Sequence, residues 1–236
     1  MIETPTSAPL HRFYLAVGGQ ARKVGKTALV VDIVNAFPDR NWTAVKITSY
    51  TESGCPLNGP SCDCAADQHL YAIHNETQHE GKTDSSRFLA AGASRALWLQ
   101  TKEGRLEAAL PALAEELKTT HTNPGARAPH LIIESDALVR FWNPSLFLMV
   151  LDPANPDFKS SALENLARAD AFVLRSPQGA FIRFSPYDSP DQSAKALLNP
   201  LPAPIKLPGN TPRFLHPISA PMPQNLRHFL AGSISA

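Results

Sequence analysis

The clearest chemical pattern in this chain of 236 residues is the glycine-bearing stretch from Gly18 to Thr27. Its end, Gly25-Lys26-Thr27, combines a residue that lets the backbone approach an anion, an ammonium for phosphate charge, and a hydroxyl that can bind Mg²⁺. A helix that begins here would add unpaired N–H groups. The stretch predicts a nucleoside triphosphate site with contacts from Gly19, Arg22, Lys23, Val24, Gly25, Lys26, Thr27 and Ala28.

One position departs from the usual phosphate-loop pattern, which has a glycine five positions before the glycine of the Gly-Lys-Thr end. That position is Gln20, and the nearest glycine, Gly19, comes one residue too early. Either the loop is one residue longer, or Gln20 replaces the first glycine. A third interpretation is an ordinary turn with a solvated Lys26, because short motifs also occur by chance.

A second group of reactive side chains follows about thirty residues later. Three cysteines, Cys55, Cys62 and Cys64, precede His69, so a Zn²⁺ site with His69 as fourth ligand is one hypothesis. An iron–sulfur cluster is another, and a redox-sensitive or structural loop is a third. An odd number of cysteines argues against a disulfide framework.

The elements around the phosphate loop follow the pattern of a parallel sheet. Apolar runs predict strands at 11–17 and 42–48, and residues 26–37 have the apolar spacing of a helix that Pro38 ends. The other expected elements are strands at 96–100, 130–133, 147–151 and 171–175, and helices at 84–93, 106–119 and 162–169. The alternation predicts a doubly wound, mostly parallel α/β sheet of the P-loop type, as far as about residue 176.

Two further segments do not fit this alternation. Residues 51–82 form an insertion rich in Cys, His, Gly and Pro, with one expected helix at 65–74. Beyond residue 184 closely spaced prolines oppose a regular ladder, so we expect an extended tail that wraps the domain and ends in a short helix at 224–230. The expected domains are a nucleotide-binding domain, 11–184, and a proline-rich extension, 185–236.

Composition excludes several classes of protein. The formal net charge is only +1, so no strong field points to nucleic acid or to an anionic membrane. The apolar runs are too short to span a bilayer, and the N-terminus lacks the basic start and apolar stretch of a signal peptide. We therefore expect a cytoplasmic protein that binds neither nucleic acid nor membrane.

Four segments, in this order, resemble the molybdopterin-guanine dinucleotide biosynthesis adapter, protein B of that pathway. They are Ala44–Thr48, Lys82–Ala93, Ala96–Leu99 and Ile132–Glu134. The resemblance covers roughly residues 13–175, although the family has Glu-Gly where this chain has Glu134-Ser135. The same skeleton is similar to dethiobiotin synthetase and its amidoligase relatives. All belong to the P-loop class of the signal-recognition and MinD-type NTPases.

The resemblance implies roles for residues at the strand ends. Glu134 would hold Mg²⁺ together with Thr27, and Lys46 would stabilise phosphate charge. Asp84 and Arg87 would sense the γ-phosphate. Alternatives stay open, because Glu134 could merely start a loop, Lys46 could be solvated, and Asp84 could be a helix cap. The expected catalytic residues are Lys26, Lys46 and Glu134.

Three functions fit these observations. The first is a slow Mg²⁺-dependent NTPase, using ATP or GTP, that acts with a protein partner as a switch or adapter in cofactor or metal-centre assembly. The second is an ATP-dependent ligase related to dethiobiotin synthetase. The third is a nucleotide-binding module without catalysis, which Gln20 supports. By analogy with the class, a homodimer is expected in which Arg22 or Lys23 reaches across.

Overall fold

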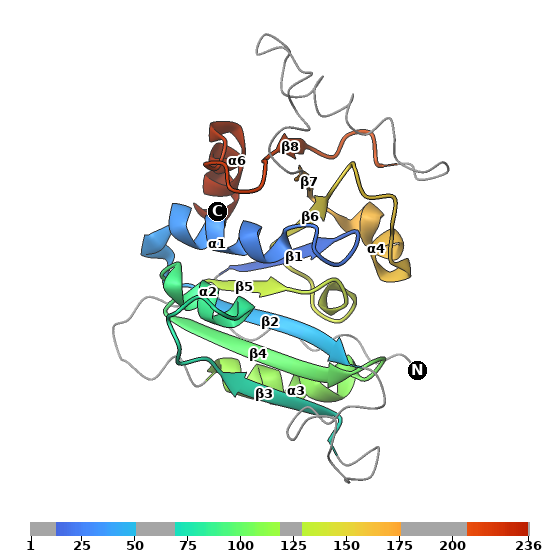
Figure 1. The fold of residues 1–236 in the computed structure, drawn as a ribbon. Helices are drawn as coiled ribbons and strands as arrows, with labels where there is room; N and C mark the ends of the chain where they lie inside the picture. Colours follow the sequence, from blue (N-terminus) through green and yellow to red (C-terminus); the bar gives the residue numbers. More distant parts are fainter. Residues whose placement is uncertain (1–12, 51–68, 119–128, 176–206, 236) are drawn as a thin grey trace.

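A computed structural model describes residues 13–50, 69–118, 129–175 and 207–235 (Figure 1). The eight strands of the described part form one sheet, in the order β3-β4-β2-β5-β1-β6-β7-β8. Only β3 runs antiparallel to its neighbour. The strands are β1 Tyr14–Gly19, β2 Thr43–Tyr50, β3 Tyr71–Asn75, β4 Arg95–Lys102, β5 Leu131–Glu134, β6 Leu146–Leu151, β7 Ala171–Leu174 and β8 Arg213–Leu215. The predicted mostly parallel sheet is confirmed.

Helices cover both faces of this sheet, as a doubly wound fold requires (Figure 1). On one face, α1, α2 and α6 pack against alternate residues of β1 such as Leu15 and Val17. On the other, α3 and α4 pack against Tyr14 and Ala16. Within the described ranges, none of the helices is long and apolar enough to cross a membrane. Their bounds are α1 Lys26–Ala36, α2 Asp84–Ala90, α3 Leu106–Lys118, α4 Ser160–Asn165 and α6 Gln224–Ser235, with 3₁₀ helices at Pro38–Arg40, Leu138–Arg140 and Leu166–Arg168.

The loop between β1 and α1 lies at the carboxyl edge of the sheet. β1 is buried along its whole length and pairs with β5 on one side and β6 on the other. α1 begins directly after Gly25, whose φ of +93° is a backbone conformation that favours glycine. The loop therefore leaves the centre of the sheet, at the edge where open α/β folds place their ligands.

The helix predicted at 65–74 is wrong for the part of it that the structure describes. From Tyr71 to Asn75 the chain is strand β3, paired antiparallel with β4. The local apolar spacing of this segment suits a helix, but β4 offers an open row of backbone donors and acceptors. Pairing with that edge overrides the local preference.

The chain beyond residue 206 also differs from the expected extended tail. Residues 213–215 form β8, which extends the sheet beyond β7 in parallel register. The last helix, α6, continues to Ser235, and its Leu226 and Leu230 are buried in the core that α1 shares. Prolines prevent long helices and strands, but a strand of three residues needs only a few backbone hydrogen bonds to the neighbouring strand. The boundary proposed at residues 184–185 lies outside the described residues and stays a prediction.

Candidate functional site

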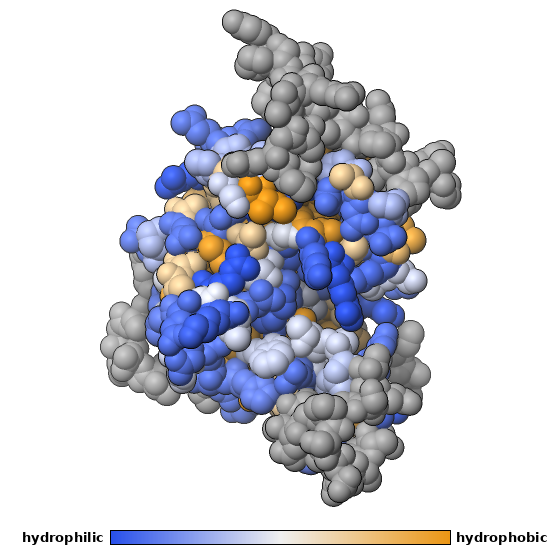
Figure 2. All heavy atoms as spheres, in the orientation of Figure 1, coloured by the Kyte–Doolittle hydropathy of each residue, from blue (hydrophilic) through white to orange (hydrophobic). Residues whose placement is uncertain are grey.

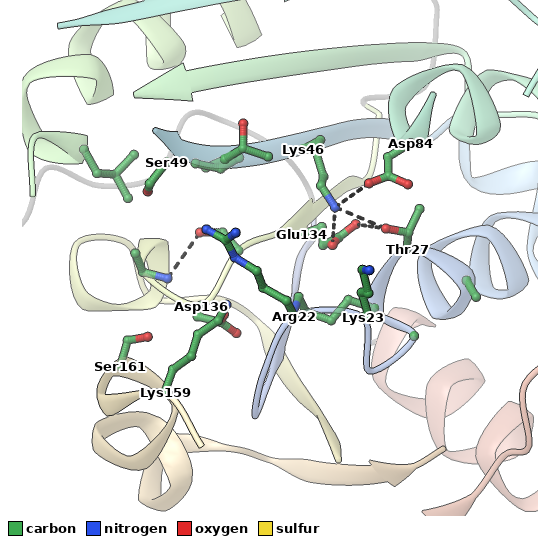
Figure 3. Close-up of a pocket in the computed structure, with 18 of the residues that line it drawn as sticks. Arg22, Lys23, Thr27, Lys46, Ser49, Asp84, Glu134, Asp136, Lys159 and Ser161 are labelled. Carbon is green, nitrogen blue, oxygen red and sulfur yellow. Dashed lines mark hydrogen bonds and ion pairs between the residues drawn. The ribbon is translucent and has the colours of Figure 1, made fainter. Parts of the chain in front are cut away.

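A cavity of about 920 Å³ opens at the carboxyl edge of the sheet, above the loop that joins β1 to α1 (Figure 3). That loop, the ends of β2 and β5, and the starts of α2 and α4 form its wall. On the face shown in Figure 2, hydrophilic residues border a hollow near the centre of the molecule. The predicted site residues that line the cavity are Arg22, Lys23, Gly25, Lys26, Thr27, Ala28, Lys46, Asp84, Arg87 and Glu134.

Two predicted contact residues, Gly19 and Val24, belong to the framework of the loop and not to the cavity wall. Val24 is buried in the core beneath α1. A Cβ atom on Gly19 would lie 2.9 Å from Val24 Cγ2 and 3.0 Å from the carbonyl oxygen of Val150, so a side chain does not fit there. Counted from Gly19, the loop would be one residue longer than the common pattern.

Gln20 anchors this longer loop to the turn that follows β6. Its side chain is fully buried. The amide oxygen accepts a hydrogen bond from the backbone N–H of Asp152 at 2.7 Å. The amide nitrogen donates to the carbonyl oxygens of Asn155 at 2.7 Å and Asp157 at 3.3 Å. Gln20 is thus a structural anchor of the loop.

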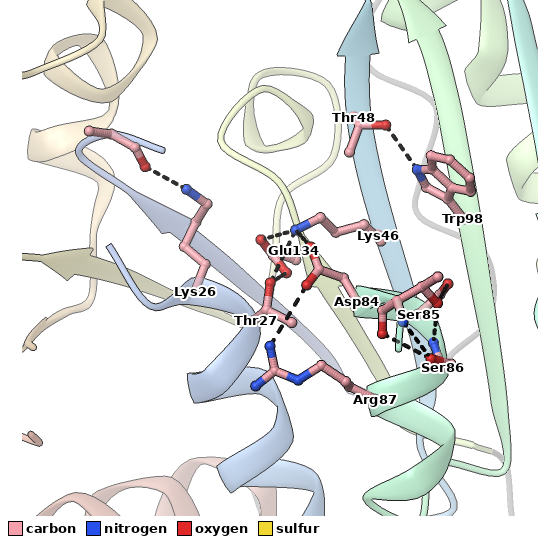
Figure 4. A network of polar contacts seen from close by, with 12 residues as sticks. Lys26, Thr27, Lys46, Thr48, Asp84, Ser85, Ser86, Arg87, Trp98 and Glu134 are labelled. Atoms are coloured by element: carbon pink, nitrogen blue, oxygen red, sulfur yellow. Dashed lines mark hydrogen bonds and ion pairs between the residues drawn. The ribbon is translucent and has the colours of Figure 1, made fainter. Parts of the chain in front are cut away.

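The side chain of Lys26 folds back over the loop (Figure 4). Its Nζ donates to the carbonyl oxygen of Ala21 at 2.8 Å. Burial lowers the pKa of Lys26, and the attraction of Asp136 offsets part of that effect. A neutral carbonyl compensates an ammonium less than an anion does. The Lys26 ammonium therefore has no anion in direct contact among the described residues.

The ammonium of Lys46 is surrounded by oxygen atoms from three other elements (Figure 4). It lies 2.5 Å from Oε1 of Glu134, 2.9 Å from Oδ2 of Asp84, and donates to Oγ1 of Thr27 at 3.1 Å. The Thr27 hydroxyl donates in turn to Oε2 of Glu134 at 2.7 Å. One side chain of β2 thus joins the first turns of α1 and α2 to the end of β5.

Charge compensation explains this arrangement. The Glu134 side chain is only 3% exposed, and a buried carboxylate is stable only when it is paired. Burial alone would lower the pKa of Lys46, but Glu134 and Asp84 together outweigh it, so the pKa is raised. Lys46 is therefore an ammonium at neutral pH. Lys46 is therefore not a solvated lysine, and Glu134 is more than the first residue of a loop.

Asp84 is not the cap of α2, although it opens that helix. The N-cap is Thr83, whose hydroxyl accepts a hydrogen bond from the backbone N–H of Ser86 at 3.1 Å in a capping box. The Asp84 carboxylate is therefore free to face Lys46. The guanidinium of Arg87 lies 3.8 Å from Asp84, which is a loose pair, and it also lines the cavity.

Asp136 also lines the cavity, although the sequence pattern did not indicate it as a site residue, and Lys159 lies beside it. Asp136 Oδ1 accepts the backbone N–H of Gly19 at 2.5 Å, and Oδ2 lies 3.3 Å from Lys159 Nζ. Both line the cavity beside the loop (Figure 3). Its position, two residues after the strand that ends in Glu134, could have indicated Asp136 as a residue of the site.

The predicted cysteine site lies mostly outside the described residues, because Cys55, Cys62 and Cys64 fall in 51–68. His69 is described, and its carbonyl oxygen accepts a hydrogen bond from the Tyr50 hydroxyl at 2.7 Å. Among the residues that the structure covers, no group of three His, Cys, Asp or Glu side chains is arranged to hold a metal ion. The zinc and iron–sulfur hypotheses therefore stay predictions.

Replacing Gln20 with Gly, which would restore the common loop pattern, is expected to destabilise the protein. The change removes three side-chain hydrogen bonds, each worth about 1 kcal/mol, and frees the backbone. We expect the free energy of unfolding in urea to fall by roughly 2–4 kcal/mol. Gln78→Gly, at an exposed position, is the control and should cost less than about 1 kcal/mol. Equal stability of Gln20→Gly and wild type would contradict the anchoring role.

No protein-family model matches the chain, and no curated protein matches it. Among solved structures, the chain is similar to HypB from Helicobacter pylori in complex with nickel, with 16% identity, coverage of 94% of this chain and 87% of that chain, and a TM-score of 0.49. It is also similar to the apo form of LpxK from Aquifex aeolicus in complex with ATP, with 14% identity, coverage of 90% and 55%, and a TM-score of 0.43. Similarity at this level transfers no function. The loop that joins β1 to α1 lies between a buried strand and a helix and ends in Gly25-Lys26-Thr27, which agrees with the P-loop type predicted from the sequence.

Proposed function

We propose that this chain binds a nucleoside triphosphate with Mg²⁺ in the cavity and hydrolyses it slowly, as a switch or adapter in cofactor or metal-centre assembly. One observation carries the proposal. Oxygen atoms of Thr27, Asp84 and Glu134 converge on a single cation, the ammonium of Lys46, beside the phosphate loop. The adapter role of the molybdopterin-guanine dinucleotide type comes from the sequence resemblance alone.

The three oxygen donors fit Mg²⁺. This ion prefers carboxylate, hydroxyl and phosphate oxygens and is usually held by one or two carboxylates together with the substrate phosphates. Thr27, Asp84 and Glu134 offer that donor set where an ammonium already balances the charge. When bound, Mg²⁺ would neutralise charge on the β- and γ-phosphates.

The residues of the chain would then do the following. Lys26 would leave the Ala21 carbonyl and contact a phosphate oxygen, while the N–H groups at the start of α1 face the same anion. Lys46, displaced by the metal, would turn to the γ-phosphate, because its long side chain keeps its charge within reach. Arg87 is exposed enough to move toward the same group. Each of these cations would stabilise negative charge on the phosphates.

A switch follows from the same contacts. Lys46 is paired with Asp84 at the start of α2, so exchange of Lys46 for Mg²⁺ would replace the tie between α2 and the phosphate loop with one that forms only when the metal ion is bound. α2 follows the segment that leads out of β3, and this segment ends the predicted insertion at 51–82. Nucleotide would thereby change the surface that a partner protein meets. The handling of a metal by the cysteines of the insertion is part of this proposal.

Replacing Lys26 with Ala is expected to abolish nucleotide binding, because the loop loses its phosphate-facing ammonium. The measurement is calorimetry with Mg²⁺ and either ATP or GTP. Lys82→Ala is the matched control, since that side chain is 80% exposed and does not line the cavity. Unchanged affinity of the Lys26 variant would sink the assignment of the site.

Replacing Lys46 with Met is expected to make folding stability depend on Mg²⁺. The change leaves Glu134 buried without its cation, which costs about 3–5 kcal/mol, and Mg²⁺ can compensate by taking the same place. We expect Mg²⁺ to raise the melting temperature of this variant by several degrees and that of wild type very little. Lys159→Met, which breaks the pair with Asp136, is the control. An equal response to Mg²⁺ in all three proteins would contradict the metal site.

A second candidate, an ATP-dependent ligase, is favoured by the extent of the cavity. Its wall continues past the phosphate loop to Ser49, Glu103 and Leu106, which leaves room for a small acceptor. The two candidates differ in their products. A switch releases phosphate slowly without any acceptor, whereas a ligase forms a new product and releases phosphate only when its carboxylate substrate is present.

A further inference from the structure

Behind the phosphate loop lies a cluster of ionisable groups, two of them fully buried, that the proposed function does not use. Arg175 follows β7, His216 follows β8, and Asp32 lies on α1. Asp32 Oδ2 is 3.1 Å from Arg175 Nη1 and 2.8 Å from His216 Nε2. The side chains of Arg175 and His216 are fully buried. The cluster joins the last two strands of the sheet to the helix that carries the loop.

Arg175 touches the loop itself at Gly25. A Cβ atom on Gly25 would lie 3.1 Å from both Cδ and Nε of Arg175, and 3.6 Å from Cδ1 of Ile218. Gly25 lines the cavity, whereas Arg175 does not. The guanidinium therefore supports this glycine from behind the cavity wall. The contact also explains why position 25 has no room for a side chain, in addition to its positive φ.

The charge of Arg175 is incompletely compensated within the described part of the chain. Its Nε and Nη2 are buried and have no hydrogen-bond partner there, so Asp32 alone balances it. Burial lowers the pKa of Arg175 and Asp32 opposes that effect. An arginine nevertheless keeps its proton in proteins. A permanent positive charge thus lies against the N-terminal end of α1.

The direction of the ion pair matters for an anion in the loop. The positive member touches Gly25, which caps α1, and the negative member is Asp32, about two turns further along the helix. The pair is therefore a dipole parallel to that of α1, whose positive end also points to the loop. Both fields favour negative charge at the same place, and water screens this pair only in part, because the Arg175 side chain is fully buried while that of Asp32 is 27% exposed.

We propose that Arg175 is a positioning residue of the phosphate site, which acts through Gly25 by holding the loop and by adding a buried positive potential beneath the bound phosphates. The inference rests on the proposed nucleotide binding. It also makes the C-terminal segment part of the site, because His216 and Ile218 complete the cluster behind Gly25.

The test compares Arg175→Met and Arg175→Lys with wild type in the full chain. Arg213→Met is the matched control, because Arg213 also has a buried Nε without a partner but lies at the other end of β8. Calorimetry measures affinity for ATP, ADP and inorganic tripolyphosphate, and thermal denaturation checks folding. We expect Arg175→Met to bind the triphosphates roughly ten- to thirtyfold more weakly, and ADP with a smaller loss. Arg213→Met should stay within about twofold.

The lysine variant separates charge from packing. A buried lysine loses its proton far more readily than arginine, so Arg175→Lys should bind nearly as wild type at about pH 6 and progressively more weakly toward about pH 9. Affinity is expressed as a ratio to wild type at each pH. Lys26 of the loop, and Asp32 and His216 of the cluster, are common to both proteins. A purely structural arginine would give a ratio that does not change with pH.

The outcomes keep the two proposals apart. A wild-type protein that binds none of the three ligands overturns the proposed function, and the inference with it. A wild-type protein that binds, with a folded Arg175→Met variant of equal affinity, overturns the inference alone. A pH-independent ratio for Arg175→Lys, or the same loss in Arg213→Met, does so as well. A pH-dependent ratio supports the inference even if Arg175→Met fails to fold.

Discussion

The site depends on one electrostatic requirement, the pairing of a buried carboxylate with a cation. Glu134 ends the central strand β5 with almost no exposure to water, and a carboxylate in that position must be compensated. Lys46 compensates it and at the same time contacts Thr27 and Asp84. Four elements thereby meet at one ammonium, and this meeting point lies directly beside the phosphate loop. Any cation that replaces Lys46 acquires the same ligands.

The two lysines of the cavity illustrate how environment separates identical side chains. Lys46 is tied to carboxylates and has a raised pKa, whereas Lys26 is bonded to a carbonyl and has a lowered one. In the proposed function the first is displaced by the metal ion, and the second is a cation that lacks a direct anionic contact among the described residues. A triphosphate with its metal ion would satisfy both conditions together.

Local pattern predicted most of the fold but failed where pairing is made between distant segments. β1 and α1 were found because a continuous apolar run and a helical apolar period are local signals. β3 was mistaken for helix because the open edge of β4 is invisible in the sequence around Tyr71. β8 was not predicted because a strand of three residues among prolines is too short to show an alternation of apolar and polar residues. In the site, Lys46, Asp84 and Glu134 were indicated by the family resemblance together with their places at element ends, whereas Asp136 could not be distinguished from an ordinary loop carboxylate.

The sequence by itself determined the chemistry that is present: a Gly25-Lys26-Thr27 end after a buried strand, and charged residues at the ends of the neighbouring strands. These are properties of residue type and local spacing, so the sequence shows them without a structure. Only the tertiary structure showed that Gly19 has no room for a side chain and that Gln20 anchors the loop to the turn after β6. It also brought Arg175 against Gly25. Such contacts join residues more than a hundred positions apart, and their distances are set by how the whole sheet packs.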